Sequence, residues 1–120
     1  MYKILVIDDD PKLLELVKYI LQREGYMLFF ALTGEQGIKV TKKEKPDLIL
    51  MDIMLPKMDG LEAISKIKND PSLKDIPIII LSALGQEMDI VEGLNRGAVS
   101  YIVKPFSYHV LLNEIKLRLK

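Results

Sequence analysis

The chain has 120 residues, 49% of them hydrophobic, which is enough for one compact domain with a single buried core. Its 17 basic and 17 acidic residues cancel, so no overall field attracts nucleic acid or an anionic membrane, and we expect no direct binding to either. Cysteine is absent, which excludes disulfides and thiolate metal sites and suits a reducing cytosol.

Short apolar runs alternate with helix-like patterns from one end of the chain to the other. The expected elements, in chain order, are strand 4–7, helix 11–24, strand 26–31, helix 34–44, strand 48–51, helix 60–69, strand 76–81, helix 88–96, strand 101–103 and helix 107–119. The first run is too short for a signal peptide or a membrane span, so we expect a soluble, cytoplasmic protein.

The strands are apolar throughout rather than alternating, which is typical of strands covered on both faces. Strands that alternate with helices in this way predict a parallel sheet between two helical layers. Right-handed crossovers then favour a doubly wound α/β fold, and the lack of repeats or linkers predicts one domain over residues 1–120. In such folds, functional sites form beyond the carboxyl ends of the strands.

Polar residues follow the expected strands at this edge. Asp8 and Asp9 come after the first strand, Asp52 after the third, Ser82 after the fourth and Lys104 after the fifth. Because the carboxyl ends of parallel strands meet at one edge, we expect these side chains to lie close together.

The charges of this group need compensation. Two carboxylates 4 Å apart repel by about 4 kcal/mol at an effective dielectric constant of 20. Lys104 can neutralise one charge, and a divalent cation can neutralise two more. Oxygen ligands without His or Cys favour Mg²⁺, Mn²⁺ or Ca²⁺, and Mg²⁺ usually combines a few protein oxygens with a phosphate oxygen. The sequence therefore predicts a site for Mg²⁺ and a phosphoryl group.

Other polar residues have structural explanations. Asp10 precedes Pro11 and is expected to cap the first helix. His109, the single histidine, lies in the last helix, away from the acidic edge, and is expected to be structural or exposed to solvent.

The order and spacing of several motifs resemble the receiver domains of two-component response regulators over essentially the whole chain. The motifs are ILVIDD at 4–9, DLILMD at 47–52, LPKMDG at 55–60, IIILSA at 78–83, Gly97-Ala98, and YIVKPF at 101–106. The resemblance implies a flavodoxin-like three-layer sandwich with strand order 2-1-3-4-5.

The resemblance also implies a role for each residue of the site. Asp52 is the expected phosphoacceptor, Lys104 the phosphate-binding lysine, Ser82 the switch hydroxyl and Tyr101 the switch aromatic. The expected Mg²⁺ ligands are Asp8, Asp9, Asp52 and the backbone carbonyl of Met54. A cis peptide bond between Lys104 and Pro105 is implied as well.

The resulting functional prediction is a signalling switch rather than an enzyme. Asp52 would take a phosphoryl group from a sensor histidine kinase or a phosphotransfer protein. The surface formed by residues 88–96, 101–103 and 107–119 would then change toward an output domain, a downstream protein or a second copy of the chain. Receivers attached to winged-helix DNA-binding domains usually carry acidic residues where Val99 and Ser100 stand, so the charged dimer interface of that subfamily is not matched.

Three alternative functions match parts of the sequence. A small haloacid-dehalogenase-like phosphatase could use Asp8 and Asp10, with Ser82 as its hydroxyl, but Lys12 replaces the usual Thr or Val and the chain has no room for a cap domain. A flavodoxin-like electron carrier is disfavoured because the acidic first loop would repel the phosphate of FMN. A phosphorylation-independent interaction module does not account for the intact acidic edge.

Overall fold

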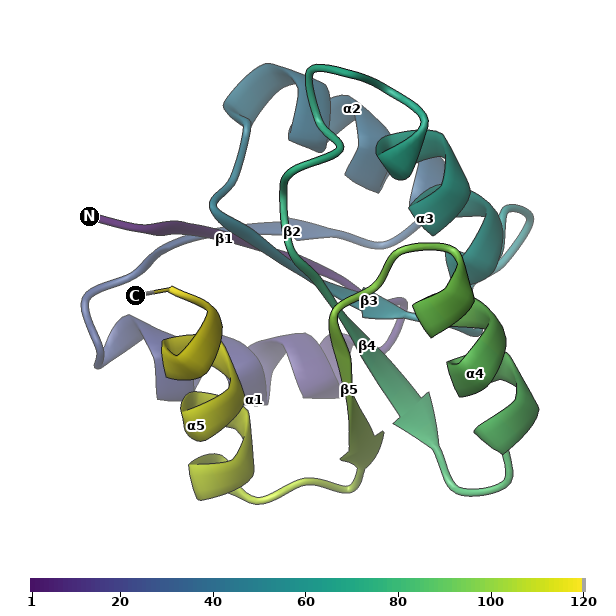
Figure 1. The fold of residues 1–120 in the computed structure, drawn as a ribbon. Coiled ribbons are helices and arrows are strands. Elements are labelled where there is room, and N and C mark those ends of the chain that lie inside the picture. Colours follow the sequence, from purple (N-terminus) through teal and green to yellow (C-terminus); the bar gives the residue numbers. More distant parts are fainter. Residues whose placement is uncertain (120) are drawn as a thin grey trace.

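A computed structural model describes residues 1–119 as a central sheet between two layers of helices (Figure 1). The elements are β1 Lys3–Ile7, α1 Pro11–Gln22, β2 Met27–Ala31, α2 Gly34–Glu44, β3 Leu48–Asp52, α3 Gly60–Lys68, β4 Ile78–Ala83, α4 Glu87–Asn95, β5 Ser100–Lys104 and α5 Tyr108–Arg118. All neighbouring strands are parallel, in the order β2-β1-β3-β4-β5. The predicted fold class and strand order are confirmed.

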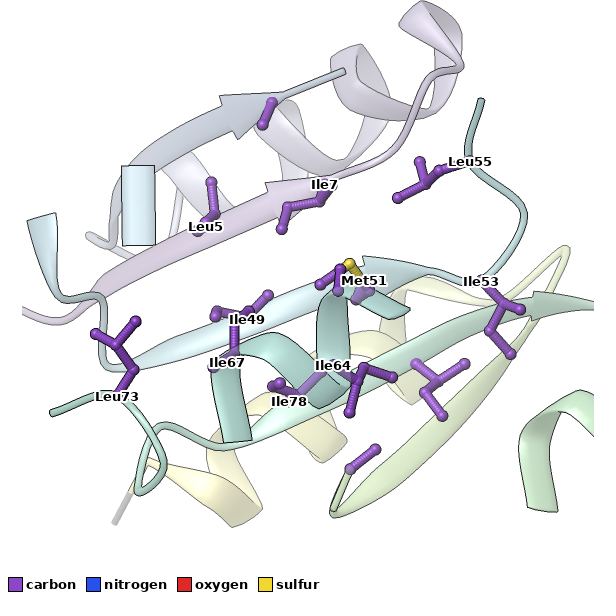
Figure 2. Packing of buried hydrophobic residues seen from close by; sticks show 14 of the residues in the cluster. Leu5, Ile7, Ile49, Met51, Ile53, Leu55, Ile64, Ile67, Leu73 and Ile78 are labelled. Atoms are coloured by element: carbon purple, nitrogen blue, oxygen red, sulfur yellow. The ribbon is translucent and has the colours of Figure 1, made fainter. Parts of the chain in front are cut away.

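The two faces of the sheet pack against different helices because successive side chains of a strand point to opposite faces. On β1, Leu5 and Ile7 belong to the core cluster that contains the buried residues of α3, such as Ile64 (Figure 2). Ile4 and Val6 belong to the second cluster, with buried residues of α1 and α5. Burial on both faces explains why the strands are apolar at almost every position.

The predicted element boundaries were less accurate than the element types. β4 begins at Ile78 rather than at 76 and continues to Ala83 rather than 81. Pro77 has no N–H to donate to the sheet, although its carbonyl accepts a hydrogen bond from Ile49 at 3.0 Å. The end of β4 is extended because Ser82 and Ala83 pair with β5, which itself runs from Ser100 to Lys104.

The pairing register brings the strand ends level with one another. Asp52 pairs with Leu81, one residue before Ser82, and Ala83 pairs with Lys104. Residues that are far apart in sequence therefore meet at one edge of the sheet. Within residues 1–119, no helix has the length and apolar character needed to cross a membrane.

Candidate functional site

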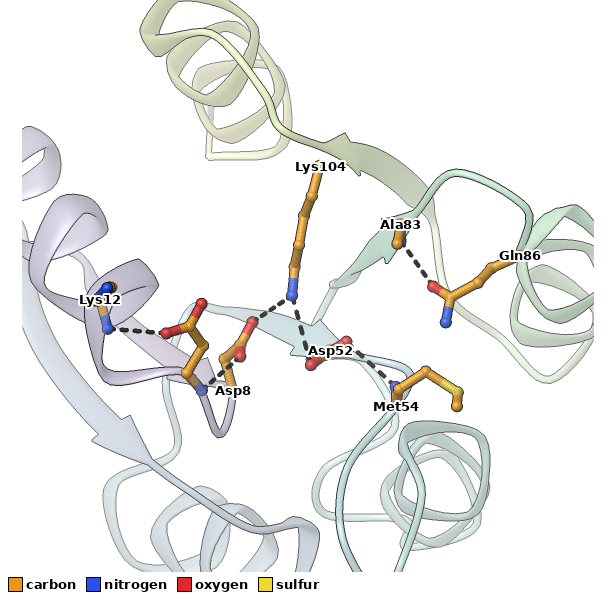
Figure 3. A network of polar contacts seen from close by, with 8 residues as sticks. Asp8, Lys12, Asp52, Met54, Ala83, Gln86 and Lys104 are labelled. Carbon is orange, nitrogen blue, oxygen red and sulfur yellow. Dashed lines mark hydrogen bonds and ion pairs between the residues drawn. The ribbon is translucent and has the colours of Figure 1, made fainter.

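Three charged side chains meet at the carboxyl edge of the sheet (Figure 3). Asp8 follows β1, Asp52 ends β3 and Lys104 ends β5. The Nζ of Lys104 lies 2.8 Å from Oδ2 of Asp8 and 3.5 Å from Oδ2 of Asp52. One ammonium group therefore contacts two carboxylates that come from β1 and β3, on the far side of β4 from β5.

Backbone amides hold the two carboxylates in place. Asp8 is fully buried, and its Oδ1 accepts the N–H of Asp10 at 3.0 Å. Asp52 is 5% exposed, and its Oδ1 accepts the N–H of Met54 at 3.2 Å. Each carboxylate is thus oriented by the turn that follows it, with its other oxygen facing Lys104.

The environment changes the acidity of Asp52. Burial and the neighbouring charge of Asp8 raise the pKa of Asp52 to about 6, although Lys104 and the Met54 N–H act in the opposite direction. Burial opposes the charge of Lys104, but its hydrogen bond to Asp8 and the charges of both aspartates raise the lysine pKa above its usual value. Two buried acidic side chains therefore face a single cation.

The donor set fits a hard divalent cation. Carboxylate oxygens of Asp8, Asp9 and Asp52 lie within 4.8 Å of one another, and Asp9 is exposed while its two neighbours are buried. Oxygen ligands on one side and open solvent on the other suit Mg²⁺, which keeps several of its waters. The expected ligand role of the Met54 carbonyl stays a prediction.

Magnesium should stabilise this protein, because it relieves the repulsion between the buried carboxylates. At tenfold excess over its dissociation constant, we expect a gain of about 1.4 kcal/mol in the free energy of unfolding. Denaturant titrations with and without Mg²⁺ measure the gain, which Asp9→Asn should largely remove and Asp75→Asn, at an exposed loop position, should leave intact. A stability indifferent to millimolar Mg²⁺ would contradict the site.

Ser82 and Tyr101 have different surroundings. Ser82 is fully buried, and within residues 1–119 its hydroxyl oxygen has no hydrogen-bond partner. A buried hydroxyl without a partner is costly, so it is ready to bond a group that arrives nearby. Tyr101 on β5 is 47% exposed and lies against the outside of the sheet edge, beside α4. The structure thus places Ser82 at the carboxyl edge of the sheet, whereas the side chain of Tyr101 lies at the surface.

The structural explanations for the other polar residues are confirmed. Asp10 is the N-cap of α1 and accepts the N–H of Lys12 at 3.0 Å, so its carboxylate is engaged by the helix. His109 is exposed on α5, where its ring lies edge-on against Tyr108. The peptide bond between Lys104 and Pro105 is cis, as the resemblance implied.

Two contacts near the site were missed in the sequence analysis. A side chain at Gly60 would collide with the backbone at the end of β3, since its Cβ would meet the carbonyl oxygen of Asp52 and stand 2.7 Å from the Cα of Ile53, the next residue. The turn after Asp52 can close only because residue 60 has no side chain, which the Asp-Gly pair at 59–60 could have indicated. The side-chain oxygen of Gln86 accepts the N–H of Ala83 at 2.7 Å, and nothing in the sequence pattern predicts this contact.

Fold and site together define a class of signalling domain. A model of the response regulator receiver domain matches residues 4–116, and the chain belongs to that family. It is a receiver domain of the two-component type, a signalling domain rather than an enzyme in its own right.

Relatives and solved structures agree with this assignment. The DNA-binding dual master transcriptional regulator RpaA of Synechocystis sp. is 38% identical over 120 residues, which is all of this chain and 50% of that protein. The alkaline phosphatase synthesis transcriptional regulatory protein PhoP of Bacillus subtilis is 44% identical over 105 residues, 88% of this chain and 43% of that protein. The chain spans about half the length of the curated relatives it matches.

Among solved structures, the chemotaxis response regulator CheY4 of Vibrio cholerae superimposes with a TM-score of 0.92 at 29% identity, covering 98% of each chain. The receiver domain of NtrX from Brucella abortus superimposes with a TM-score of 0.90 at 30% identity, covering 97% of each chain. The first is described as a response regulator and the second as a receiver domain, and both have the same fold as this chain.

Proposed function

We propose that this domain is a phosphorylation switch in which Asp52 accepts a phosphoryl group from the phosphohistidine of a sensor histidine kinase or a phosphotransfer protein. The observation that carries the proposal is the placement of Asp52 between the acidic pair Asp8 and Asp9 and the ammonium group of Lys104. Such an arrangement supplies positioning and charge neutralisation, which are what phosphoryl transfer requires of a protein.

In the transfer, an oxygen of the Asp52 carboxylate bonds to phosphorus while the phosphorus–nitrogen bond of the donor breaks, and the electron pair of that bond stays with the imidazole. Lys104 lies within 3.5 Å of the attacking carboxylate and can pair with a phosphoryl oxygen on the product. Mg²⁺, held by Asp8, Asp9 and Asp52, would neutralise charge on the phosphoryl oxygens. The hydroxyl of Ser82 can then donate a hydrogen bond to the new group.

The signal would leave the site through a coupled movement of Ser82 and Tyr101. If Ser82 turns toward the phosphoryl group, Tyr101 can turn inward into the space that the hydroxyl leaves. The groove outside Tyr101 has a volume of about 380 Å³ and is apolar, with Leu84, Val91 and Leu94 in its lining. Phosphorylation then biases a two-state equilibrium of the α4-β5-α5 surface, which would contact an output domain, a downstream protein or a second copy.

Phosphorylation mapping tests the proposal. Acetyl phosphate with Mg²⁺, or a cognate kinase, should label the protein on Asp52, and Asp52→Asn should abolish the label because an amide oxygen is a poor nucleophile. Asp10→Asn is the matched control, since Asp10 is occupied as a helix cap and should leave labelling intact. Label that persists at an unchanged rate in Asp52→Asn, or that maps to Asp8, would overturn the assignment.

The role of Ser82 gives a separate prediction. Ser82→Ala should still accept the phosphoryl group, because Asp52 and Lys104 remain, yet it should lose the donor that couples phosphate to Tyr101. Amide NMR spectra before and after phosphorylation measure this coupling, and signals from β5 and α4 should move much less in the variant. If they move as far as in the parent protein, the coupling does not pass through Ser82.

A further inference from the structure

The loop between β4 and α4 is tied by the side chain of Gln86. Its Oε1 accepts the N–H of Ala83 at 2.7 Å, across a turn made by Leu84 and Gly85. Gln86 stands at the N-cap position of α4, yet its side chain makes no capping bond to that helix. The carboxamide therefore bonds the end of the strand instead of its own helix (Figure 3).

The tied residue lies next to the site. Ala83 pairs in the sheet with Lys104 and directly follows Ser82, whose buried hydroxyl has no partner within the described part of the chain, residues 1–119. Its N–H is thus a backbone donor at the same edge where Lys104 contacts Asp8 and Asp52. In the present conformation that donor is already used by Gln86.

We propose that Gln86 is a latch that holds the β4–α4 loop in its unphosphorylated conformation. The inference rests on the proposed function of Asp52. A phosphoryl group on Asp52 brings new acceptor oxygens to the edge, and these compete with Gln86 Oε1 for the donor at Ala83. The latch favours the unphosphorylated conformation and thereby lowers the apparent affinity of the protein for a phosphoryl ligand, because only the unlatched fraction of molecules is competent to bind.

The chain offers a matched control for this contact. At the end of β2, Oε1 of Gln36 accepts the N–H of Leu32 at 2.9 Å, which is the same chemistry in the loop before α2. Neither Leu32 nor Gln36 contributes to the cluster of Asp8, Asp52 and Lys104. Gln→Met at each position removes the acceptor while keeping the length and much of the shape of the side chain.

The probe is beryllofluoride with Mg²⁺, which mimics a phosphoryl group on a carboxylate, titrated by amide NMR. Gln86→Met should lower the apparent dissociation constant roughly threefold to tenfold, the range expected for one net hydrogen bond. Gln36→Met should leave it within twofold of the parent value. Gln86→Glu keeps an acceptor at this position and should not tighten binding.

A second readout does not depend on phosphoryl chemistry. Without beryllofluoride, the amide of Ala83 should exchange with solvent about threefold to tenfold faster in Gln86→Met than in the parent, whereas Gln36→Met should not change it. Faster exchange together with unchanged or weaker beryllofluoride binding would overturn the latch and leave the function of Asp52 standing. Unchanged exchange would overturn it too, and failure of the parent itself to bind beryllofluoride would overturn the proposed function and the latch together.

Discussion

Exchanging Met54 for Asn and Leu84 for Glu should shorten the lifetime of the phosphorylated protein by tenfold or more. Hydrolysis of an aspartyl phosphate needs a water in line with the departing oxygen of Asp52. Met54 and Leu84 stand two residues after Asp52 and Ser82, positions that flank the phosphate in receiver domains, so we expect them to flank that approach. Neither side chain can orient a water by hydrogen bonding. Each 1.36 kcal/mol removed from the barrier is about tenfold in rate, and orienting a water can supply that much.

The structure leaves both side chains free to act in this way. Met54 is 59% exposed and Leu84 is 81% exposed, so neither is committed to the core. Decay of the phosphorylated form in excess Mg²⁺, followed by loss of label, measures the effect. The matched control is Leu16→Glu with Met88→Asn, which changes exposed residues of the same types on α1 and α4. Equal decay of parent and double variant, or a parent that loses its phosphate within seconds, would refute the prediction.

Slow loss of phosphate from the unsubstituted protein has a consequence for function. A signal that persists suits a slow output such as transcription better than rapid motor control. RpaA and PhoP, both described as transcriptional regulators, are relatives that fit such an output, but this chain matches only about half of each. We therefore propose a slow output on the basis of Met54 and Leu84.

Asp52→Asn should make the metal-free protein more stable at neutral pH, by about 2 kcal/mol. The pKa of Asp52 is about 6 in the folded chain, against an ordinary value of 3.8, because burial and Asp8 oppose its charge. This difference corresponds to about 3 kcal/mol at 1.36 kcal/mol per unit, and we reduce it because the site lies at the solvent edge of the sheet. The amide carries no charge to bury, so the variant avoids the cost.

The raised pKa of Asp52 also makes the stability of the fold depend on pH. Between pH 3.8 and about 6 the folded chain binds the Asp52 proton more tightly than the unfolded chain, so the stability contributed by this group falls as the pH rises through that window. Urea titrations in a chelator at pH 5 and pH 7.5 should show this loss in the parent and not in Asp52→Asn. Glu15→Gln, at an exposed position of α1, is the control and should behave as the parent. An Asn variant that is less stable than the parent at pH 7.5 would contradict the raised pKa.

Much of the fold could be predicted because its signals are local. Apolar runs of three to six residues between helix-like segments identified every strand, and continuous rather than alternating apolar residues indicated burial on both faces. Boundaries were less accurate where pairing decides them. β4 extends to Ala83 only because β5 lies beside it, and no local pattern records a neighbour that is distant in sequence.

The sequence also indicated which residues form the site, but it did not indicate their burial or their acidity. Asp8 and Asp9 are adjacent and chemically identical, yet the first is fully buried and the second is exposed, since neighbouring side chains at a strand end point in different directions. The pKa of Asp52 depends on burial and on the charge of Asp8, which arrives from another strand.

The sequence by itself determined which polar residues come to the carboxyl edge of the sheet, since the chain order of strands and helices dictates a parallel sheet whose carboxyl ends share one edge. Only the tertiary structure decided how those residues meet. The pairing register brings Asp52, Ser82 and Lys104 level with one another and places the Gln86 side chain against the N–H of Ala83. Among the residues that the structure describes, it leaves the Ser82 hydroxyl without a partner. These are contacts of short range between groups whose positions depend on the whole packed sheet, so no local pattern in the chain encodes them.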